Sequence, residues 1–278
     1  MTCFLGAPKK FYKKSTVPKN NPLEGINVLV TRPEGQSEHL CSLIEQSGGR
    51  AIAFPVLEIK DIADSSHLAK QIESLHTFDI AIFISANAVK KAVNQIFAQR
   101  TWPKSTKIAA VGKTSAKALD SLGLIADIFP STKFNSEALL AMPQLENVSE
   151  KRIIIFRGEG GREHLAETLK ARGATVEYAE CYKRCKPKTD ASKLLKLWAR
   201  GEIHIIVTTS NEGLRNLYDM VGQVGRQWLI KSPMVVISDR AADFAMQLGF
   251  KSKPVVSNQA NDEAILNSLI AWSNIQNH

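Results

Sequence analysis

The sequence has little cysteine and lacks any long apolar run. Its four cysteines, Cys3, Cys41, Cys181 and Cys185, are too few and too scattered for a disulfide framework, and no second ligand pair lies near the last two to complete a zinc site. We therefore expect reduced thiols in a cytoplasmic protein. No apolar stretch approaches the roughly 20 residues that a membrane helix requires, because the strongest, Ile80–Ile84, has the length of a strand. The sequence thus predicts no membrane partner.

Acidic residues are missing from the first segment of the chain, and this explains most of the net positive charge. The 278 residues contain 36 Lys and Arg against 27 Asp and Glu, a formal net charge of +9. Five of the positive charges lie in residues 1–21, so the remainder carries only +4, which is too little to predict a nucleic-acid partner. We expect residues 1–21 to form a disordered basic tail. Nucleic-acid binding through this tail is kept as an alternative.

Motifs for metal, nucleotide and hydrolase chemistry are also missing. The six histidines form no pair spaced by four residues, and no Gly-x-Ser-x-Gly turn is present. Residues 112–114 have the Gly-Lys-Thr of a phosphate-binding P-loop, but the glycine required five residues earlier is Lys107. The glycines at 158 and 160 start a dinucleotide fingerprint whose third glycine is replaced by Glu163. We therefore expect neither a metal ion nor a nucleotide cofactor.

Short apolar runs alternate with amphipathic segments of helical length along the chain. The strand-like runs include Ile26–Val30, Ile80–Ile84, Ile108–Val111, Ile153–Phe156, Ile203–Val207 and Met234–Ile237. The helix-like segments include Ser37–Ser47, Ala88–Phe97, Ser115–Leu122, Glu163–Arg172 and Asp239–Leu248. This alternation, without a hairpin signature, predicts an α/β fold with doubly wound parallel sheets.

The chain repeats itself at an offset of 125 to 126 residues. The segment Arg32–Leu40 matches Arg157–Leu165, and the serine of Phe-Ile-Ser85 corresponds to that of Thr-Thr-Ser210. The glycines at 48 and 173 and the Glu-Ala segments at 137 and 263 keep the same order and spacing. We therefore expect two similar α/β halves.

Small polar residues and arginines follow the predicted strands and precede the predicted helices in both halves. These positions are Arg32, Ser85, Gly112, Arg157, Ser210 and Ser238. Open parallel sheets bind ligands at such turns, and the helix N-termini there favour anions. Arg162 and Arg240 lie close by in sequence. We therefore interpret the turns as the lining of an anion-binding cleft between the halves. The alternative is that the serines only cap helices, and the two roles are compatible.

Seven segments follow one another in a characteristic order: Val28–Pro33 with Gln36, Phe83–Val89, Ala110–Leu119, Arg157–Leu165, Cys181–Arg184, Thr208–Asn211 and Ser238–Arg240. Their order and spacing resemble those of the uroporphyrinogen-III synthase family, and the resemblance covers about residues 22 to 275. Some positions depart from it. Ile84 replaces a common threonine, so a hydroxyl contact is lost there. Ser115 and Ala241-Ala242 stand where a Thr-Ala pair is frequent, so the second half lacks a hydroxyl at that point and no threonine role is carried over to Ala241.

The resemblance implies cyclisation of hydroxymethylbilane to uroporphyrinogen III, with loss of water and inversion of the last pyrrole ring, without metal or cofactor. Tyr182 matches a family tyrosine proposed to protonate the leaving hydroxyl and is the candidate catalytic residue. Packing of one connecting strand onto the other is the alternative role for this ring. The candidate substrate-binding residues are Arg32, Ser85, Asn87, Gly112, Ser115, Arg157, Arg162, Ser210, Ser238 and Arg240. A non-catalytic two-domain protein that closes on an anionic metabolite is the alternative function.

The family fold implies that the domains differ from the halves of the repeat. Domain 1 then combines residues 22–57 with 187–278, and domain 2 comprises residues 58–186. Extended crossings near residues 55–60 and 178–186 form a two-stranded linker, which we expect to act as a hinge. We also expect a monomer, because no long exposed apolar stripe stands out. A transient contact with hydroxymethylbilane synthase is left open.

Overall fold

The computed structural model describes residues 21–161 and 163–276, which divide into two compact units. Unit 1 contains the residues up to Val56 and those from Lys188 onward, and unit 2 is Leu57–Pro187. Unit 1 is therefore built from two separate stretches of chain. The basic segment 1–20 and the candidate residue Arg162 lie outside the described residues.

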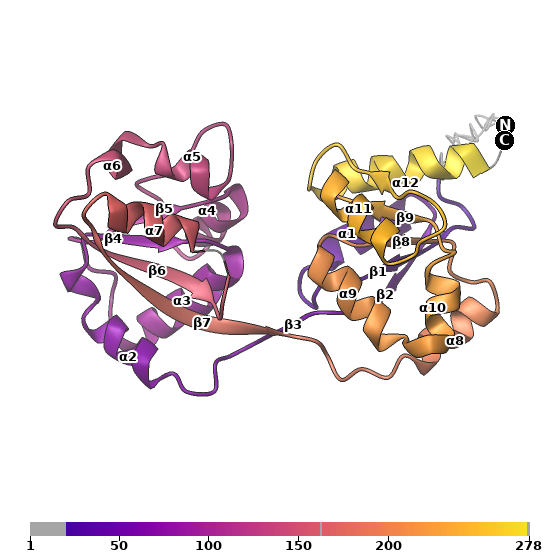
Figure 1. Ribbon diagram of the computed structural model, residues 1–278, viewed down its shortest axis with the longest axis horizontal. Helices are drawn as coiled ribbons and strands as arrows, with labels where there is room; N and C mark the ends of the chain where they lie inside the picture. The colour runs from indigo at the N-terminus through magenta and orange to yellow at the C-terminus, as the bar shows by residue number, and fades with distance from the viewer. Residues whose placement is uncertain (1–20, 162, 277–278) are drawn as a thin grey trace, which may run out of the picture. The chain divides into compact units, whose positions relative to one another are not determined.

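Unit 1, as far as the structure describes it, is a parallel sheet of five strands with helices on both faces (Figure 1). The strand order is β10 (Val255–Val256), β9 (Met234–Val236), β8 (Ile205–Val207), β1 (Asn27–Val30) and β2 (Arg50–Ala53). One face carries α1 (Glu38–Gln46) and α12 (Asp262–Gln276), and the other carries α8 (Ser192–Ala199), α9 (Asn211–Met220), α10 (Gly222–Leu229) and α11 (Asp239–Gln247). Because both faces are covered, the central strands are apolar throughout.

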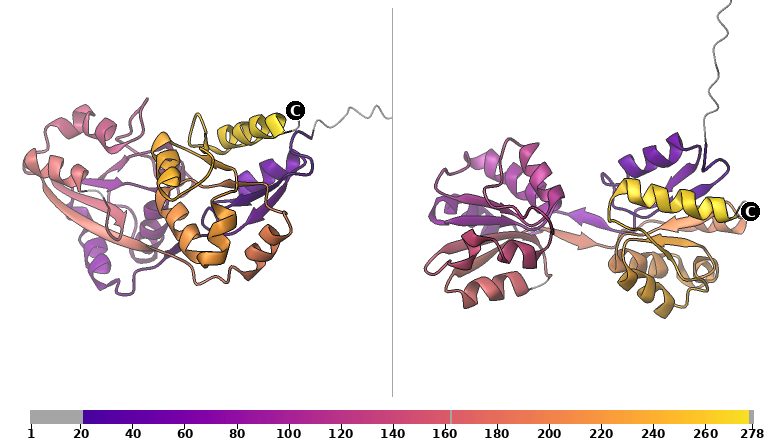
Figure 2. Two further views of the ribbon diagram at one scale, coloured as in Figure 1. Left: turned by 45° about the vertical axis from the view of Figure 1, so that its right-hand side comes forward. Right: turned by 90° about the horizontal axis from the view of Figure 1, so that it is seen from above.

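Unit 2 has the same layered plan, and Figure 2 shows its helices on both faces of the sheet. The described strands run in the order β3 (Glu58–Lys60), β7 (Thr175–Cys185), β6 (Arg152–Gly158), β4 (Ile80–Phe83) and β5 (Lys107–Ala110). One face packs against α2 (Ser66–Glu73), the 3-10 turn η1 (Leu75–Thr77), α3 (Ala86–Gln99) and α4 (Lys113–Asp120). The other packs against α5 (Ser136–Leu140), α6 (Pro143–Glu146) and α7 (His164–Ala171).

The edge strand β3 differs from the parallel pairing that strand–helix alternation predicts. It pairs antiparallel with the end of β7, with Glu58 opposite Cys185. The reason is local, because β3 forms just after the chain enters unit 2 and the end of β7 is where the chain leaves it. The entering and leaving segments run in opposite directions and therefore pair antiparallel.

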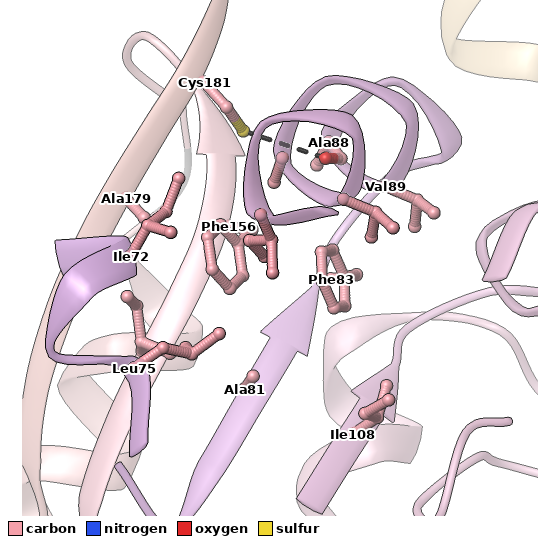
Figure 3. Packing of buried hydrophobic residues seen from close by; sticks show 14 of the residues in the cluster. Ile72, Leu75, Ala81, Phe83, Ala88, Val89, Ile108, Phe156, Ala179 and Cys181 are labelled. Carbon is pink, nitrogen blue, oxygen red and sulfur yellow. Dashed lines mark hydrogen bonds between the residues drawn. The ribbon is translucent and has the colours of Figure 1, made fainter. Parts of the chain in front are cut away.

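The core of unit 2 between the sheet and α3 brings the ends of β4, β6 and β7 into one layer (Figure 3). Phe83 of β4 stacks on Phe156 of β6 with ring centroids 4.8 Å apart, and both are fully buried. Ala88 and Val89 of α3 cover this pair, and Cys181 of β7 points toward the same helix. This packing fixes the three strand ends relative to one another.

The sequence repeat appears in the backbone conformation of its glycines. Gly35 and Gly160, which follow the repeated arginines, have φ values of 76° and 68°. Gly48 and Gly173, which end the following helices, have φ values of 87° and 89°. Side chains other than glycine rarely adopt this left-handed region, so the repeat preserves a turn and a helix end in both units.

Candidate active site

A pocket of about 370 Å³ lies at the carboxyl ends of β5, β4, β6 and β7 in unit 2. Its polar lining comes from Ser85, Ser136, Arg157, Tyr178, Tyr182 and Arg184, and its apolar lining comes from Ile84, Val111, Ile155 and Leu165. The pocket therefore joins an aliphatic surface to hydroxyls and two guanidinium groups. It lies where open parallel sheets bind ligands, as the sequence predicts for these turns.

Tyr182 and Ser85 form a hydrogen-bonded pair in this pocket. The Tyr182 hydroxyl lies 3.0 Å from Ser85 Oγ, and the tyrosine is only 4% exposed. Ser85 is the N-cap residue of α3, and its Oγ accepts a hydrogen bond of 3.1 Å from the Ala88 amide. Ser85 therefore caps α3 and lines the pocket at the same time. The phenol is held by a hydroxyl that is itself fixed to a helix N-terminus.

Arg157 is a buried pocket residue that also holds its own turn together. Its Nε donates to the carbonyl oxygens of Gly158 and Gly160 at 3.2 and 3.0 Å. Its Nη1 pairs with Glu163 Oε1 at 3.1 Å, and its guanidinium lies over the Tyr178 ring at 4.3 Å from the centroid. Much of the hydrogen-bonding capacity of this side chain is thus used by the β6–α7 turn.

Glu163 and Tyr178 complete this arrangement. The Tyr178 hydroxyl donates to Glu163 Oε2 at 2.5 Å, and this bond, followed by those from Arg157, lowers the pKa of Glu163. Burial, followed by the Glu163 carboxylate, raises the pKa of Tyr178 to about 12. At neutral pH the carboxylate is therefore charged and the phenol protonated, so Tyr178 is poorly suited to donate its proton to a substrate.

Three other candidates from unit 2 are described by the structure but do not line this pocket. Asn87 is half-buried in the first turn of α3, and Gly112 precedes α4 as its N-cap residue. Ser115 lies within α4 and is 1% exposed, so its hydroxyl faces the protein interior. Arg162 lies outside the described residues.

The serine candidates of unit 1 follow adjacent strands and cap the helices that come next. Ser210 follows β8, and its Oγ accepts from the Gly213 amide at 2.9 Å. Ser238 follows β9, and its Oγ accepts from the Ala241 amide at 3.3 Å. Arg240 is exposed in the first turn of α11. These contacts establish the capping role and leave a substrate role as a prediction.

Arg32, the remaining candidate, follows β1 and forms an ion pair with a distant residue. Its Nη1 lies 2.5 Å from Asp262 Oδ1, at the start of α12. The second oxygen of the same carboxylate lies 2.7 Å from Nδ1 of His39. Asp262 thus neutralises the charge of Arg32 and orients His39 at this edge of unit 1.

Neither a metal centre nor a membrane span is found in residues 21–161 and 163–276. No group of three or more His, Cys, Asp or Glu side chains there could hold a metal ion. No helix within these residues is both long and apolar enough to cross a bilayer.

Comparison with known proteins places the chain in a family. The model of the family described as uroporphyrinogen-III synthase HemD matches residues 38–267. The chain belongs to the uroporphyrinogen-III synthase family. It is 36% identical to the uroporphyrinogen-III synthase of Escherichia coli over 246 residues, 88% of this chain and 100% of the relative. It is 31% identical to that of Synechococcus elongatus, over 78% of this chain and 83% of the relative.

Solved structures of the uroporphyrinogen-III synthase family share the fold. A mutant enzyme from Thermus thermophilus matches with a TM-score of 0.61 at 18% identity, over 91% of this chain and 100% of that one. The Helicobacter pylori protein matches with a TM-score of 0.58 at 12% identity, over 89% and 99%. The α/β fold and the family resemblance that the sequence predicts are confirmed.

Several pocket residues are absent from the sequence-based candidate set. Tyr178 and Arg184 line the pocket together with Tyr182 and lie at even spacing from it on β7. For Arg184, two residues after Tyr182, this spacing is a usable signal because such side chains share a face of a strand. For Tyr178 it is not, because the strand pairing shifts between Tyr178 and Tyr182. Ser136 enters from α5, and no spacing in the sequence relates it to the uroporphyrinogen-III synthase motifs.

Proposed function

We propose that this member of the uroporphyrinogen-III synthase family cyclises hydroxymethylbilane to uroporphyrinogen III, with loss of water and inversion of the last pyrrole ring. We further propose that Tyr182 is the proton donor and that the unit 2 pocket holds the reacting end of the substrate. The observation that carries the assignment of Tyr182 is its hydroxyl at 3.0 Å from Ser85 Oγ in a pocket at the strand ends. A buried tyrosine that only packs would also need a partner for its hydroxyl, so the support for the catalytic role is the place of this hydroxyl in the lining of the pocket.

The hydrogen-bond chain at Tyr182 suits a proton donor. For the phenol to give its proton to the leaving hydroxyl, Ser85 must be the donor in their shared hydrogen bond. Ser85 Oγ can do so because it already accepts from the Ala88 amide. As the proton leaves, the Ser85 hydroxyl and the N-terminus of α3 stabilise the developing phenolate. An electron-rich pyrrole assists loss of water, so a weak acid is sufficient.

The pocket lining suits part of a tetrapyrrole with acidic side chains. A volume of about 370 Å³ lies at the lower end of the roughly 300–1,000 Å³ of small-molecule sites, so it accommodates only part of so large a substrate. Ile84 and Val111 offer an aliphatic surface for a pyrrole face. Arg184, which is exposed, offers positive charge to substrate carboxylates, whereas a carboxylate at Arg157 must compete with Glu163. Holding the two ends of the chain together then supplies much of the acceleration.

The proposed substrate site also includes residues of unit 1. Arg32, Ser210, Ser238 and Arg240 are proposed to bind further carboxylates of the substrate. The cleft shared by the two halves and its closure on substrate stay predictions. So do the monomeric state, the cytoplasmic location and the transient contact with hydroxymethylbilane synthase.

The test of the function is the isomer of the product. The protein is incubated with hydroxymethylbilane, and the type I and type III uroporphyrinogens are separated. Spontaneous closure gives only type I, so formation of type III at a rate proportional to protein concentration supports the proposal. Type I alone, together with saturable binding of the bilane, would favour the alternative of a non-catalytic binding protein.

The test of the proton donor is Tyr182→Phe, which keeps the ring and removes the hydroxyl. We expect kcat for type III formation to fall about 100-fold or more, since general acids contribute roughly 10²–10⁴. Thermal unfolding measures stability in parallel, and its midpoint should change far less than kcat. Unchanged type III formation would remove the role of Tyr182.

A further inference from the structure

We infer that a β-bulge at Cys181, together with the absence of a side chain at Gly158, turns Tyr182 toward Ser85 and aims its hydroxyl into the pocket. Gly158 and Cys181 are thereby positioning residues for the proton donor. This inference rests on the proposed function, because it concerns how the proposed acid is placed.

The strand pairing locates the bulge. β6 and β7 pair in parallel register up to Arg157 opposite Glu180, and the next pair is Gly158 opposite Tyr182. Cys181 therefore has no partner and is an extra residue on β7. Such an insertion changes the direction of the side chains that follow it, and bulges occur often beside active sites.

The bulge changes the face of the sheet on which Tyr182 lies. Ala179 and Cys181 belong to the cluster packed under α3, whereas Tyr178 packs in the cluster on the α7 side. Regular alternation would place Tyr182 on the face of Tyr178. Instead Tyr182 belongs to the α3-side cluster together with its neighbour Cys181. Only on that side can it reach Ser85, the N-cap of α3.

The Cys181 thiol satisfies a carbonyl group at the point where the strand pairing shifts. Its Sγ donates to the carbonyl oxygen of Arg157 at 3.1 Å and lies 3.9 Å from that of Ala88 (Figure 3). The side chain is fully buried, and burial raises the pKa of the thiol to about 12, so it stays protonated and able to donate. The thiol thus connects the bulge to both β6 and α3.

Gly158 leaves the space that the phenol occupies. A Cβ at this position would lie 2.6 Å from Cε2, 2.7 Å from Cζ and 3.1 Å from the hydroxyl oxygen of Tyr182. Any other residue would displace the ring, because such short contacts do not occur between real atoms. The Glu159 amide donates to the Tyr182 carbonyl oxygen at 2.7 Å and holds the backbone of the tyrosine in place. The ring therefore has one position, between Gly158 and Ser85.

The first experiment is a kinetic double-mutant cycle of Gly158→Ala with Tyr182→Phe. Gly158→Ala should lower kcat about 10- to 100-fold, since a misplacement of about 1 Å can cost that much, while KM changes less than threefold. In the Tyr182→Phe background the same substitution should lower kcat no further. An equal fall in both backgrounds, or wild-type kcat in Gly158→Ala, would overturn the inference. Wild-type kcat in Tyr182→Phe would instead overturn the proposed role of the tyrosine.

A stability cycle tests the placement without using activity. Gly158→Ala is measured in the wild type and in Tyr182→Ala, where the ring is gone. The loss in unfolding midpoint should be present in the first background and at least halved in the second. Equal losses in both would show that the alanine meets something other than the ring and would overturn the inference.

A matched pair at Cys181 tests the bulge. Cys181→Ser keeps a donor of similar size, and Cys181→Ala removes it. We expect kcat of the serine variant to stay within about threefold of wild type and that of the alanine variant to fall at least tenfold, with KM changed little in both. Equal kcat values for the two variants would contradict a role for the hydrogen bond to Arg157.

Discussion

The hydroxyl of Ser85 has two partners, and its removal should affect stability and turnover by separable amounts. Ser85→Ala removes the cap on the Ala88 amide, which costs about 1 kcal/mol of stability, within a usual range of roughly 0.5–2 kcal/mol. It also removes the hydrogen bond to Tyr182. A hydrogen bond to a charged group contributes about 1.5–3 kcal/mol. Because each 1.36 kcal/mol of barrier is about tenfold in rate, kcat should fall roughly 10- to 150-fold.

A second variant separates the two effects. Glycine is a good N-cap residue and costs only a few tenths of a kcal/mol relative to serine. Ser85→Gly should therefore unfold close to the wild-type midpoint and still lose the same factor in kcat as Ser85→Ala. Rates of type III formation and thermal unfolding are measured on the same preparations, and Ser85→Thr, which keeps a hydroxyl, serves as the control.

The effect of Ser85→Ala is compared in the wild type and in the Tyr182→Phe variant. If Ser85 acts through Tyr182, Ser85→Ala should have little further effect on kcat in the Tyr182→Phe background. The same fold loss in both backgrounds would mean that Ser85 contacts the substrate directly or acts elsewhere. A kcat within twofold of wild type in Ser85→Ala would show that the hydrogen bond contributes nothing to turnover.

Contacts elsewhere in the molecule should also have measurable effects on stability and substrate binding. The pKa of Tyr178 is about 12 in the folded protein against an ordinary value near 10, so its stabilising contribution is present below about pH 10 and is lost as the pH rises toward 12. The unfolding midpoint of the wild type should therefore fall more steeply between about pH 10 and 12 than that of Tyr178→Phe. Parallel plots of midpoint against pH for the two proteins would contradict the raised pKa of Tyr178. Phe156→Ala should cost about 3–5 kcal/mol in urea unfolding, because the ring is fully buried and stacked on Phe83, and a loss below about 1 kcal/mol would contradict that packing. Asp262→Asn releases Arg32 from its ion pair and should lower KM for hydroxymethylbilane. Arg32→Gln should raise this KM. An unchanged KM in both variants would exclude Arg32 from substrate binding.

The parts of the fold with strong local patterns could be predicted from the sequence. β4, β6 and α3 match predicted segments because apolar runs of strand length and a 3.6-residue period are local signals. Short elements carry too few residues for such a period, as in α6 with four residues and β10 with two. Ser85, Arg157 and Tyr182 meet in the pocket because parallel strands end at one edge of the sheet.

The details that decide the proposed chemistry depend on tertiary contacts and carry no local signal. Alternation along β7 predicts that Tyr182 shares the face of Tyr178, and the extra residue Cys181 reverses this. A one-residue shift in register leaves no trace in composition or period. The ion-pair partner of Arg32 cannot be predicted from the sequence either, because Asp262 lies 230 residues away and belongs to no recognised motif.

The repeated arginines show how a repeat can preserve a backbone and still change what its side chains do. Arg32 follows β1 and Arg157 lies at the end of β6, and both precede glycines of the same left-handed conformation. Arg157 is neutralised by Glu163 within its own turn, whereas Arg32 is neutralised by Asp262 of α12. An arginine that is already paired contributes little net attraction, and a substrate carboxylate must compete with the resident one. We therefore propose that helix N-termini and exposed cations such as Arg240 supply most of the attraction for a polycarboxylate.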